Sequence, residues 1–386
     1  MAHEEIRAIV FDLGNTLIRE VVDDSAPLDQ FSLELLPGVK GVLAQLHSRQ
    51  LKLGILSNTE QTTSHQLRRA LRELGIGQYF STMVTSVDLV RSGVATIGKP
   101  EHVCYEHVVE LLGERPEHCA MVGNTLEDDV LGATACGLNA VLYKPSARIE
   151  HSHEHSVRIG CGSIADWESF DSCLERIANA NRLYLEAAEA ISGHNFDQGA
   201  ALFARAAELS LQVGDRHRAS ALFARAAIAQ EQKESWRVTS LMWYQAGQSL
   251  DLEHDVGVNL RHTEYDLSQH HYPSITDQQW DSIPTAQRRA KALRYAGYHA
   301  QNTNSPQDSY LLYNLAAKTY YDIGMFVEAA EVHVDACLSF IKEYGDLSDD
   351  YFSTFQQYVG KLSFQSPVDP GSLYLRQVAG ALFCER

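Results

Sequence analysis

The sequence predicts an α/β doubly wound parallel sheet followed by an all-α helical repeat domain. Short apolar runs alternate with helical segments as far as residue 174, which is typical of a parallel sheet with helices between its strands. Beyond residue 180, alanine becomes frequent and apolar residues recur three and four positions apart, which is typical of packed helices. We therefore expect one domain over residues 1–178 and a second over residues 180–386.

Five strands are expected in the first domain, because five largely apolar segments end in polar or turn-forming residues. These segments are 8–11, 51–56, 80–84, 119–122 and 140–143. Helices are expected around 42–46, 67–74 and 103–112, with a last helix over 164–174. Alternation of this kind predicts a sheet with helices on both faces.

Polar residues with chemical potential follow three of these strands, namely Asp12, Ser57 and Asp129. Each also has an ordinary interpretation, because serine caps helices well and carboxylates suit the first turn of a helix. Lys99 precedes a predicted helix and by itself would be a solvated loop residue. The carboxyl ends of parallel strands meet at one edge of a sheet, so the four residues together indicate a ligand site there.

The run Asp12-Leu13-Gly14-Asn15-Thr16-Leu17 resembles the first motif of the haloacid dehalogenase-like hydrolase superfamily, Asp-x-Asp-x-Thr-Leu. The residues that match its later motifs are Ser57, the Lys99-Pro100 pair, Gly123, Asp129, Gly132 and Ala133. Two positions depart from the pattern, because Gly14 and Asn124 stand where relatives carry aspartates. The resemblance implies the Rossmann-like fold of this superfamily.

The resemblance also implies a Mg²⁺-dependent phosphohydrolase or phosphoryl transferase that works through an aspartyl-phosphate. The implied catalytic residues are Asp12, which would be the nucleophile, Ser57 and Lys99. The implied phosphate-binding residues are Asn15, Thr16, Ser57, Asn58 and Lys99. The implied magnesium ligands are Asp12, the backbone carbonyl of Gly14, Asn124, Asp128 and Asp129.

Gly14 and Asn124 leave a second interpretation open. In relatives, the aspartate at the position of Gly14 protonates the leaving group and then activates water, and such help is typically worth about a hundred- to ten-thousandfold in rate. Its absence favours either a slow enzyme or a catalytically impaired scaffold that binds a protein partner. Asn124 weakens the magnesium site but still offers an amide oxygen.

No cap domain is expected over the site. Relatives insert caps after the first motif or between the second and third motifs. Here the first gap holds only residues 19–36, and the second, 58–98, is used by a core helix and strand. The resemblance therefore implies an open site and a phosphorylated substrate, which in capless relatives tends to be large or macromolecular.

The second domain contains an internal repeat, because the heptapeptide Ala-Leu-Phe-Ala-Arg-Ala-Ala occurs at 201–207 and at 221–227. Residues 313–336 resemble a tetratricopeptide repeat, with Gly324 in the turn and Phe326 opening the second helix. Such repeats stack into a solenoid whose concave surface would recruit the substrate or a protein partner. An ordinary all-helical domain without a groove is the alternative.

The composition argues against nucleic acid and membrane partners. The formal net charge of -18 is spread over both halves and gives no attraction for phosphate backbones or anionic lipids. No apolar run is long enough to span a bilayer, and no signal peptide is expected before the first strand. Seven scattered cysteines favour reduced thiols and a cytoplasmic protein. Three histidines lie in 151–155, but alternate loop residues rarely converge on a metal.

Overall fold

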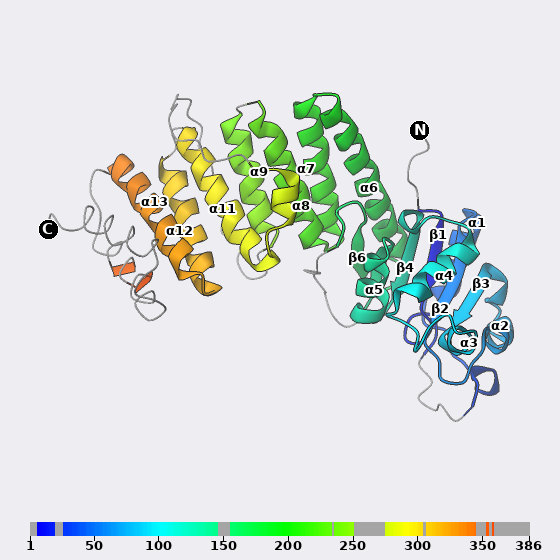
Figure 1. Ribbon diagram of the computed structural model, residues 1–386. Helices are drawn as coiled ribbons and strands as arrows, with labels where there is room; N and C mark the ends of the chain where they lie inside the picture. The colour runs from blue at the N-terminus through cyan, green and yellow to red at the C-terminus, as the bar shows by residue number, and fades with distance from the viewer. Residues whose placement is uncertain are drawn as a thin grey trace. The chain divides into compact units, whose positions relative to one another are not determined.

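The computed structural model describes residues 6–19, 26–145, 155–233, 235–250, 275–303, 306–344, 353–354 and 357–358. The chain divides into two compact units (Figure 1). The α/β unit comprises Met1–Glu186 and Arg205–Ala219. The helical unit comprises Ala187–Ala204 and Ser220–Arg386.

Six parallel strands form the sheet of the α/β unit, in the order β3-β2-β1-β4-β5-β6 (Figure 1). The strands are β1 (Ala8–Phe11), β2 (Lys52–Ser57), β3 (Phe80–Thr85), β4 (Cys119–Gly123), β5 (Asn139–Tyr143) and β6 (Cys161–Ile164). The order along the sheet reverses between β1 and β4. Doubly wound sheets bind ligands at such a switch point, outside the carboxyl ends of the strands.

Helices cover both faces of this sheet. The first six α-helices of the described chain begin in this unit. They are α1 (Val39–Ser48), α2 (Ser64–Glu73), α3 (Ser86–Arg91), α4 (His102–Leu112), α5 (Gly132–Ala135) and α6 (Phe170–Ser192). Ile9 and Phe11 belong to the apolar cluster that holds α1, α2 and the start of α6 against the sheet. Ala8 and Val10 belong to the cluster that holds α4. The central strand β1 is therefore buried on both faces, as its uninterrupted apolar run predicts.

The five predicted strands are confirmed, but the sheet has a sixth strand that the sequence pattern does not predict. β6 has the sequence Cys-Gly-Ser-Ile, whose small residues give no strand signal. It forms through parallel pairing with β5, in which Ala140 lies opposite Cys161. The predicted helix over 164–174 is wrong at its start, because Ile164 ends β6 and α6 begins at Phe170. The expected domain limit near residue 179 falls inside α6 and stays a prediction.

The helical unit is built from antiparallel neighbours along the chain (Figure 1). α7 (Phe196–Gln212) and α8 (Arg216–Glu231) contribute to both units, and the other described helices are α9 (Trp236–Gln248), α10 (Asp277–Asp281), α11 (Thr285–Asn302), α12 (Pro306–Asp322) and α13 (Phe326–Tyr344). α11 packs against α9 and α12, and α12 packs against α13. Within the described part of the chain, no helix has both the length and the apolar character needed to cross a membrane.

Aromatic side chains pack between these helices. Trp243 of α9 is buried and stacks on Tyr295 of α11, with ring centroids 4.9 Å apart. Tyr310 of α12 meets Phe340 of α13 edge to face at 5.2 Å. Gly324 has a φ of 81° in the turn between α12 and α13, where a left-handed conformation favours glycine. A tetratricopeptide-like repeat remains a prediction for this unit.

Candidate active site

The carboxyl ends of three neighbouring strands carry the predicted site. Asp12 follows β1 and Ser57 ends β2, while Gly123 ends β4. β1 pairs with both β2 and β4, so these residues lie along one edge of the sheet. The Asp12 N–H donates to the Val122 carbonyl oxygen at 2.8 Å, which extends the sheet hydrogen bonding to Asp12 and fixes its backbone.

Lys99 lies between two carboxylates. Its Nζ donates to Asp12 Oδ1 at 2.8 Å and to Asp129 Oδ1 at 2.5 Å. The side chain of Lys99 is 2% exposed, and those of Asp12 and Asp129 are 12% and 1% exposed. One ammonium group thus faces two carboxylates away from water, where each unpaired charge would be costly.

Two residues outside the predicted catalytic roles hold the Lys99 loop. Asn58 accepts from the Lys99 N–H through Oδ1 and donates to the Lys99 carbonyl through Nδ2, both at 2.9 Å. The Glu101 carboxylate accepts from the N–H groups of Thr96, at 3.0 Å, and Ile97, at 2.5 Å, and these bonds lower the pKa of Glu101. Proximity in the sequence to Ser57 and to Lys99 is the only signal that could have identified Asn58 and Glu101 for this role.

Asp129 is held by the turn that follows β4. A π-helical turn over Leu126–Leu131 carries it, and the Thr125 N–H donates to its Oδ2 at 2.9 Å. The carboxylate packs directly on Gly123, where any β-carbon would collide with it. Asp129 is only 1% exposed, so its ordinary interpretation as part of a solvated first helical turn is wrong.

Burial and charge shift the pKa values of this cluster. Burial would lower the pKa of Lys99, but Asp12 and Asp129 outweigh it and raise that pKa above its usual value. Burial raises the pKa of Asp129 to about 6, against the attraction of Lys99 and with the repulsion of Asp12. At neutral pH the lysine therefore remains a cation next to an ionised Asp129.

Thr16 links Asp12 to Asn124. Its hydroxyl oxygen lies 3.1 Å from Asp12 Oδ2 and 3.3 Å from Asn124 Oδ1. One hydroxyl hydrogen cannot serve both oxygens at once, so Thr16 leaves one of these two oxygens without its proton. Carboxylate and amide oxygens are ligands that suit a hard cation such as Mg²⁺. A β-carbon added at Gly14 would have no heavy atom within 4 Å, so the backbone at position 14 does not itself require glycine for space.

The remaining predicted residues lie around this set. Ser57 is buried at the end of β2, and Asn58 uses its side-chain amide to hold Lys99. Asn15 has a φ of 55°, in the turn after β1. Asp128 is half-buried, and its backbone carbonyl accepts a hydrogen bond from the Tyr105 hydroxyl.

The chain is similar to known phosphatases over part of its length. A glyceraldehyde 3-phosphate phosphatase of Methanothermobacter thermautotrophicus is 32% identical over 124 residues, which cover 32% of this chain and 50% of the relative. A phosphoserine phosphatase of Thermus thermophilus is 32% identical over 107 residues, which cover 28% of this chain and 39% of the relative. The chain thus spans half or less of the length of these relatives.

A solved structure and a family model also match. The structure of an uncharacterized protein from Listeria monocytogenes serotype 4b is similar at 24% identity with a TM-score of 0.40, covering 44% of this chain and 97% of that chain. Residues 26–137 match the model for haloacid dehalogenase-like hydrolases, a range that includes Ser57, Lys99 and Asp129. The chain therefore contains a haloacid dehalogenase-like hydrolase domain, as its motifs predict.

Proposed function

We propose that this chain is a Mg²⁺-dependent phosphohydrolase or phosphoryl transferase that works through an aspartyl-phosphate on Asp12. The observation that carries the proposal is the 2.8 Å contact between Asp12 Oδ1 and Lys99 Nζ at the carboxyl edge of the sheet. A carboxylate repels an approaching phosphate, and a buried ammonium next to it offsets that repulsion. The names of both relatives, which are phosphatases, support the same reaction class.

The proposed reaction has two steps. A carboxylate oxygen of Asp12 forms a bond to phosphorus while the bond between phosphorus and the leaving-group oxygen breaks. Water then attacks the phosphorus of the aspartyl-phosphate, which releases phosphate and restores the carboxylate. Lys99 stays protonated beside Asp12 through both steps, and Asp129 holds the ammonium in place.

Gly14 affects both proton transfers of this reaction, namely protonation of the leaving group and deprotonation of the attacking water. Glycine has no group that could protonate the leaving oxygen or take a proton from the attacking water. The leaving group must therefore take its proton from solvent, and the second step lacks a general base from this position. We propose that the enzyme favours good leaving groups and that the aspartyl-phosphate is long-lived.

The magnesium proposal rests on the available oxygen donors. Asp12, the Gly14 carbonyl and Asn124 would hold the ion, and Asp128 would add negative charge directly or through water. Asp129 Oδ1 already pairs with the Lys99 ammonium at 2.5 Å, so we expect Asp129 to act mainly through Lys99. Bound Mg²⁺ would neutralise phosphate charge and orient the phosphoryl group.

We also propose substrate contacts beyond the nucleophile. Asn15, Thr16 and Ser57 would bind the phosphoryl oxygens, while Asn58 would contribute through its backbone because its side chain holds Lys99. The helical unit would recruit a phosphorylated substrate, macromolecular in an uncapped site, or a protein partner. A catalytically impaired scaffold is the second candidate, and the glycine at 14 with the asparagine at 124 is what favours it.

The test is a screen of phosphorylated metabolites and phosphopeptides with and without Mg²⁺, using the full chain. We expect Mg²⁺-dependent phosphate release by the wild type and by Asp281→Asn, which changes a half-exposed carboxylate of the helical unit. Asp12→Asn should abolish the release while keeping the circular dichroism spectrum. Equal turnover by Asp12→Asn would overturn the nucleophile assignment, and no turnover of any compound would favour the scaffold.

A further inference from the structure

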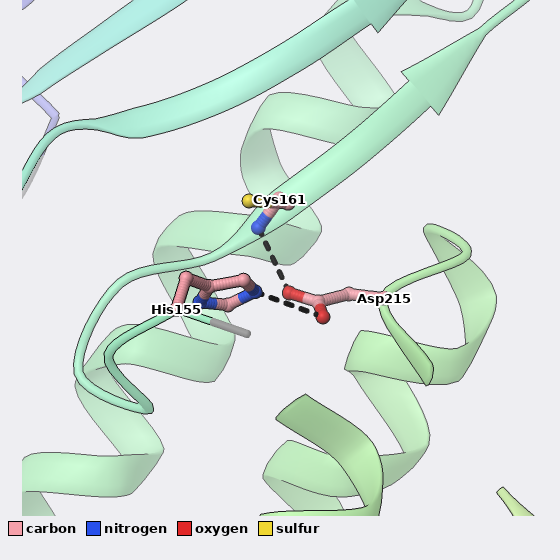
Figure 2. Close-up of side chains that lie close together, drawn as sticks. All are labelled: His155, Cys161 and Asp215. Atoms are coloured by element: carbon pink, nitrogen blue, oxygen red, sulfur yellow. Dashed lines mark hydrogen bonds and ion pairs between the residues drawn. The ribbon is translucent and has the colours of Figure 1, made fainter. Parts of the chain in front are cut away.

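A second cluster of chemically active side chains lies beside strand β6, away from the carboxyl edge of the sheet where Asp12 lies (the Asp12 edge). It consists of His155, Cys161 and Asp215, whose ligand atoms all lie within 4.8 Å of one another (Figure 2). The three come from separate segments: His155 from the loop before β6, Cys161 from the first position of β6, and Asp215 from the turn between α7 and α8. The side chains of His155 and Asp215 are each 1% exposed, and Cys161 is fully buried.

The backbone holds the carboxylate of Asp215 in a fixed position. Its Oδ2 accepts from the Cys161 N–H at 2.9 Å, and its Oδ1 accepts from the Arg218 N–H at 3.1 Å. Figure 2 shows the Asp215 carboxylate between the His155 ring and the Cys161 backbone. A ligand that is held in this way loses little freedom on binding an ion, which favours binding.

The imidazole of His155 is also oriented. Its Nδ1 lies 3.0 Å from the Ser156 carbonyl oxygen, so Nδ1 carries a hydrogen and donates it. Nε2 then faces Asp215 Oδ1 at 3.1 Å. Metal-binding histidines usually donate their second nitrogen to a carbonyl or carboxylate in this manner, which fixes the tautomer that binds.

The three ligand atoms, all within 4.8 Å of one another, are close enough to occupy three of the four positions around one tetrahedral ion. Bonds of about 2.0–2.3 Å from zinc to nitrogen, oxygen and sulfur place neighbouring ligand atoms about 3.2–3.8 Å apart. His155 Nε2 and Asp215 Oδ1 lie 3.1 Å apart, slightly closer than this range, and the Cys161 thiol is a hydrogen-bond partner of the same ring. Small rotations of these buried side chains would bring all three ligand atoms within bonding distance of one ion.

The ligand types select the metal. Thiolate with imidazole and carboxylate suits Zn²⁺, whereas Mg²⁺ requires an all-oxygen set such as that of Asp12 and Asn124. Binding would exchange the thiol proton of Cys161 and the Nε2 proton of His155 for the ion. One thiolate and one carboxylate would then neutralise the two positive charges of the ion. The buried Arg218 guanidinium would keep its hydrogen bond to the Val157 carbonyl.

We propose that His155, Cys161 and Asp215 form a zinc site that fastens the α7–α8 turn to the edge strand β6. The same turn already pairs with the strand through the Ser163 N–H and the Val213 carbonyl at 3.1 Å. A bound ion would add a link between segments that are 54 residues apart in the chain. His151 and His153 of the histidine run lie outside the described residues and are not part of the proposed site.

The test uses the full chain after removal of metals, with Zn²⁺ or Co²⁺ added alone. We expect about one Zn²⁺ per chain, a higher melting temperature with Zn²⁺ but not with Mg²⁺, and a thiolate-to-cobalt absorption band with Co²⁺. Cys161→Ser should remove that band and weaken Zn²⁺ binding at least about tenfold. Cys173→Ser, which changes another buried cysteine of the same unit, should keep both signals.

His155→Gln provides a second variant if Cys161→Ser does not fold, because a glutamine amide can still donate to Asp215. It should lose Zn²⁺ affinity by at least about tenfold and keep a native circular dichroism spectrum. Absence of Zn²⁺ binding by the wild type would overturn the proposal. So would a cobalt spectrum without a thiolate band, or equal affinity of wild type and His155→Gln.

Discussion

A buried cation between two carboxylates occurs in both units, but the surroundings differ. In the α/β unit Lys99 contacts Asp12 and Asp129, and all three side chains are at most 12% exposed. In the helical unit the 6% exposed side chain of Arg225 contacts two carboxylates, Asp277 and Asp281, that are about half exposed, at 52% and 49%. The groups are similar, and the difference lies in the solvent available to the acids.

The two helical acids lie four residues apart on α10, so one face of one helix presents both to α8. Water solvates the surplus negative charge, and the cluster serves as a tie between helices. The acids around Lys99 come from the segments that follow two different strands, β1 and β4, and little of either side chain reaches water. Burying these charges costs free energy of folding, and the cluster ties no helices together. Such a cluster is typical of a site that binds a charged ligand.

The largest expected effect comes from removing each cation in turn. Lys99→Met should lower kcat/KM for an aryl phosphate by about a hundred- to a thousandfold, because the phosphate then meets two unpaired carboxylates. Arg225→Met should leave kcat/KM unchanged and lower only the free energy of unfolding. Steady-state kinetics and urea denaturation of both variants measure this. Equal losses of activity would show that the Lys99 cluster has no special role.

Asp215 extends the comparison, because its pair with His155 is buried like the Lys99 cluster but connects segments like the Arg225 cluster. The domain limit expected from the sequence, residues 1–178, leaves Asp215 out. We expect the fragment 1–219 to be more stable than 1–178 by about 3 kcal/mol, since loss of one partner of a buried ion pair is strongly destabilising.

Urea denaturation of the two fragments, followed by circular dichroism, measures this difference. Asp215→Asn in the longer fragment separates the carboxylate from the rest of the added segment and should account for much of it. Equal midpoints for 1–178 and 1–219 would place the domain limit where the sequence predicts it.

The sequence predicts those parts of this molecule that depend on local pattern or on a recognisable motif. Five strands and the residues Asp12, Lys99 and Asp129 are of this kind, because apolar runs, the acids that follow them and the Lys99-Pro100 pair are visible in short windows. β6 could not be predicted, because its small residues have no strand preference of their own. Their extended conformation depends on pairing with β5 and with a turn 50 residues away.

Long-range contacts also limit what a repeat can predict. The heptapeptide that occurs in α7 and α8 places Arg205 on the surface and buries Arg225. Asp277 and Asp281, which pair with Arg225, are more than 50 residues away in the sequence. Local sequence therefore predicts that both segments are helices, but not which arginine is paired.

Gly14 tests whether the Asp12 edge lacks one catalytic group. A β-carbon added at this position has no heavy atom within 4 Å, and the backbone has no left-handed conformation to preserve. We expect Gly14→Asp to raise turnover about tenfold, a fraction of what general acid–base help typically contributes. Gly14→Asn has the same size but cannot transfer a proton, so it should leave turnover near that of the wild type.

Rapid-quench labelling identifies the step that changes. The wild type should show a burst of phosphate bound to Asp12, and Gly14→Asp should shorten its lifetime. A burst of equal lifetime in both proteins would mean that hydrolysis of the aspartyl-phosphate does not depend on a base at position 14. Faster turnover in Gly14→Asn would assign the gain to shape and not to proton transfer.

The smallest expected effect concerns Asp335 on α13, which contacts Arg294 of α11 at 3.5 Å. Burial raises the pKa of Asp335 to about 6, against the attraction of Arg294 and with the repulsion of Glu331. Because this pKa is higher in the folded than in the unfolded state, the folded state holds the proton more tightly. The associated stability is complete below about pH 4 and is lost as the pH rises through about 6.

The Asp335 side chain is 35% exposed, so solvent screening should keep the effect below about 1 kcal/mol. We expect the free energy of unfolding of the helical unit to fall slightly between about pH 4 and pH 6, and Asp335→Asn to flatten this decrease. Urea denaturation at several pH values measures the slope, with Asp322→Asn as the control because Asp322 is exposed and pairs with Lys318. If Asp335→Asn kept the wild-type slope, Asp335 would be solvated as fully as in the unfolded chain, and its contrast with the buried acids of the Lys99 cluster would be larger still.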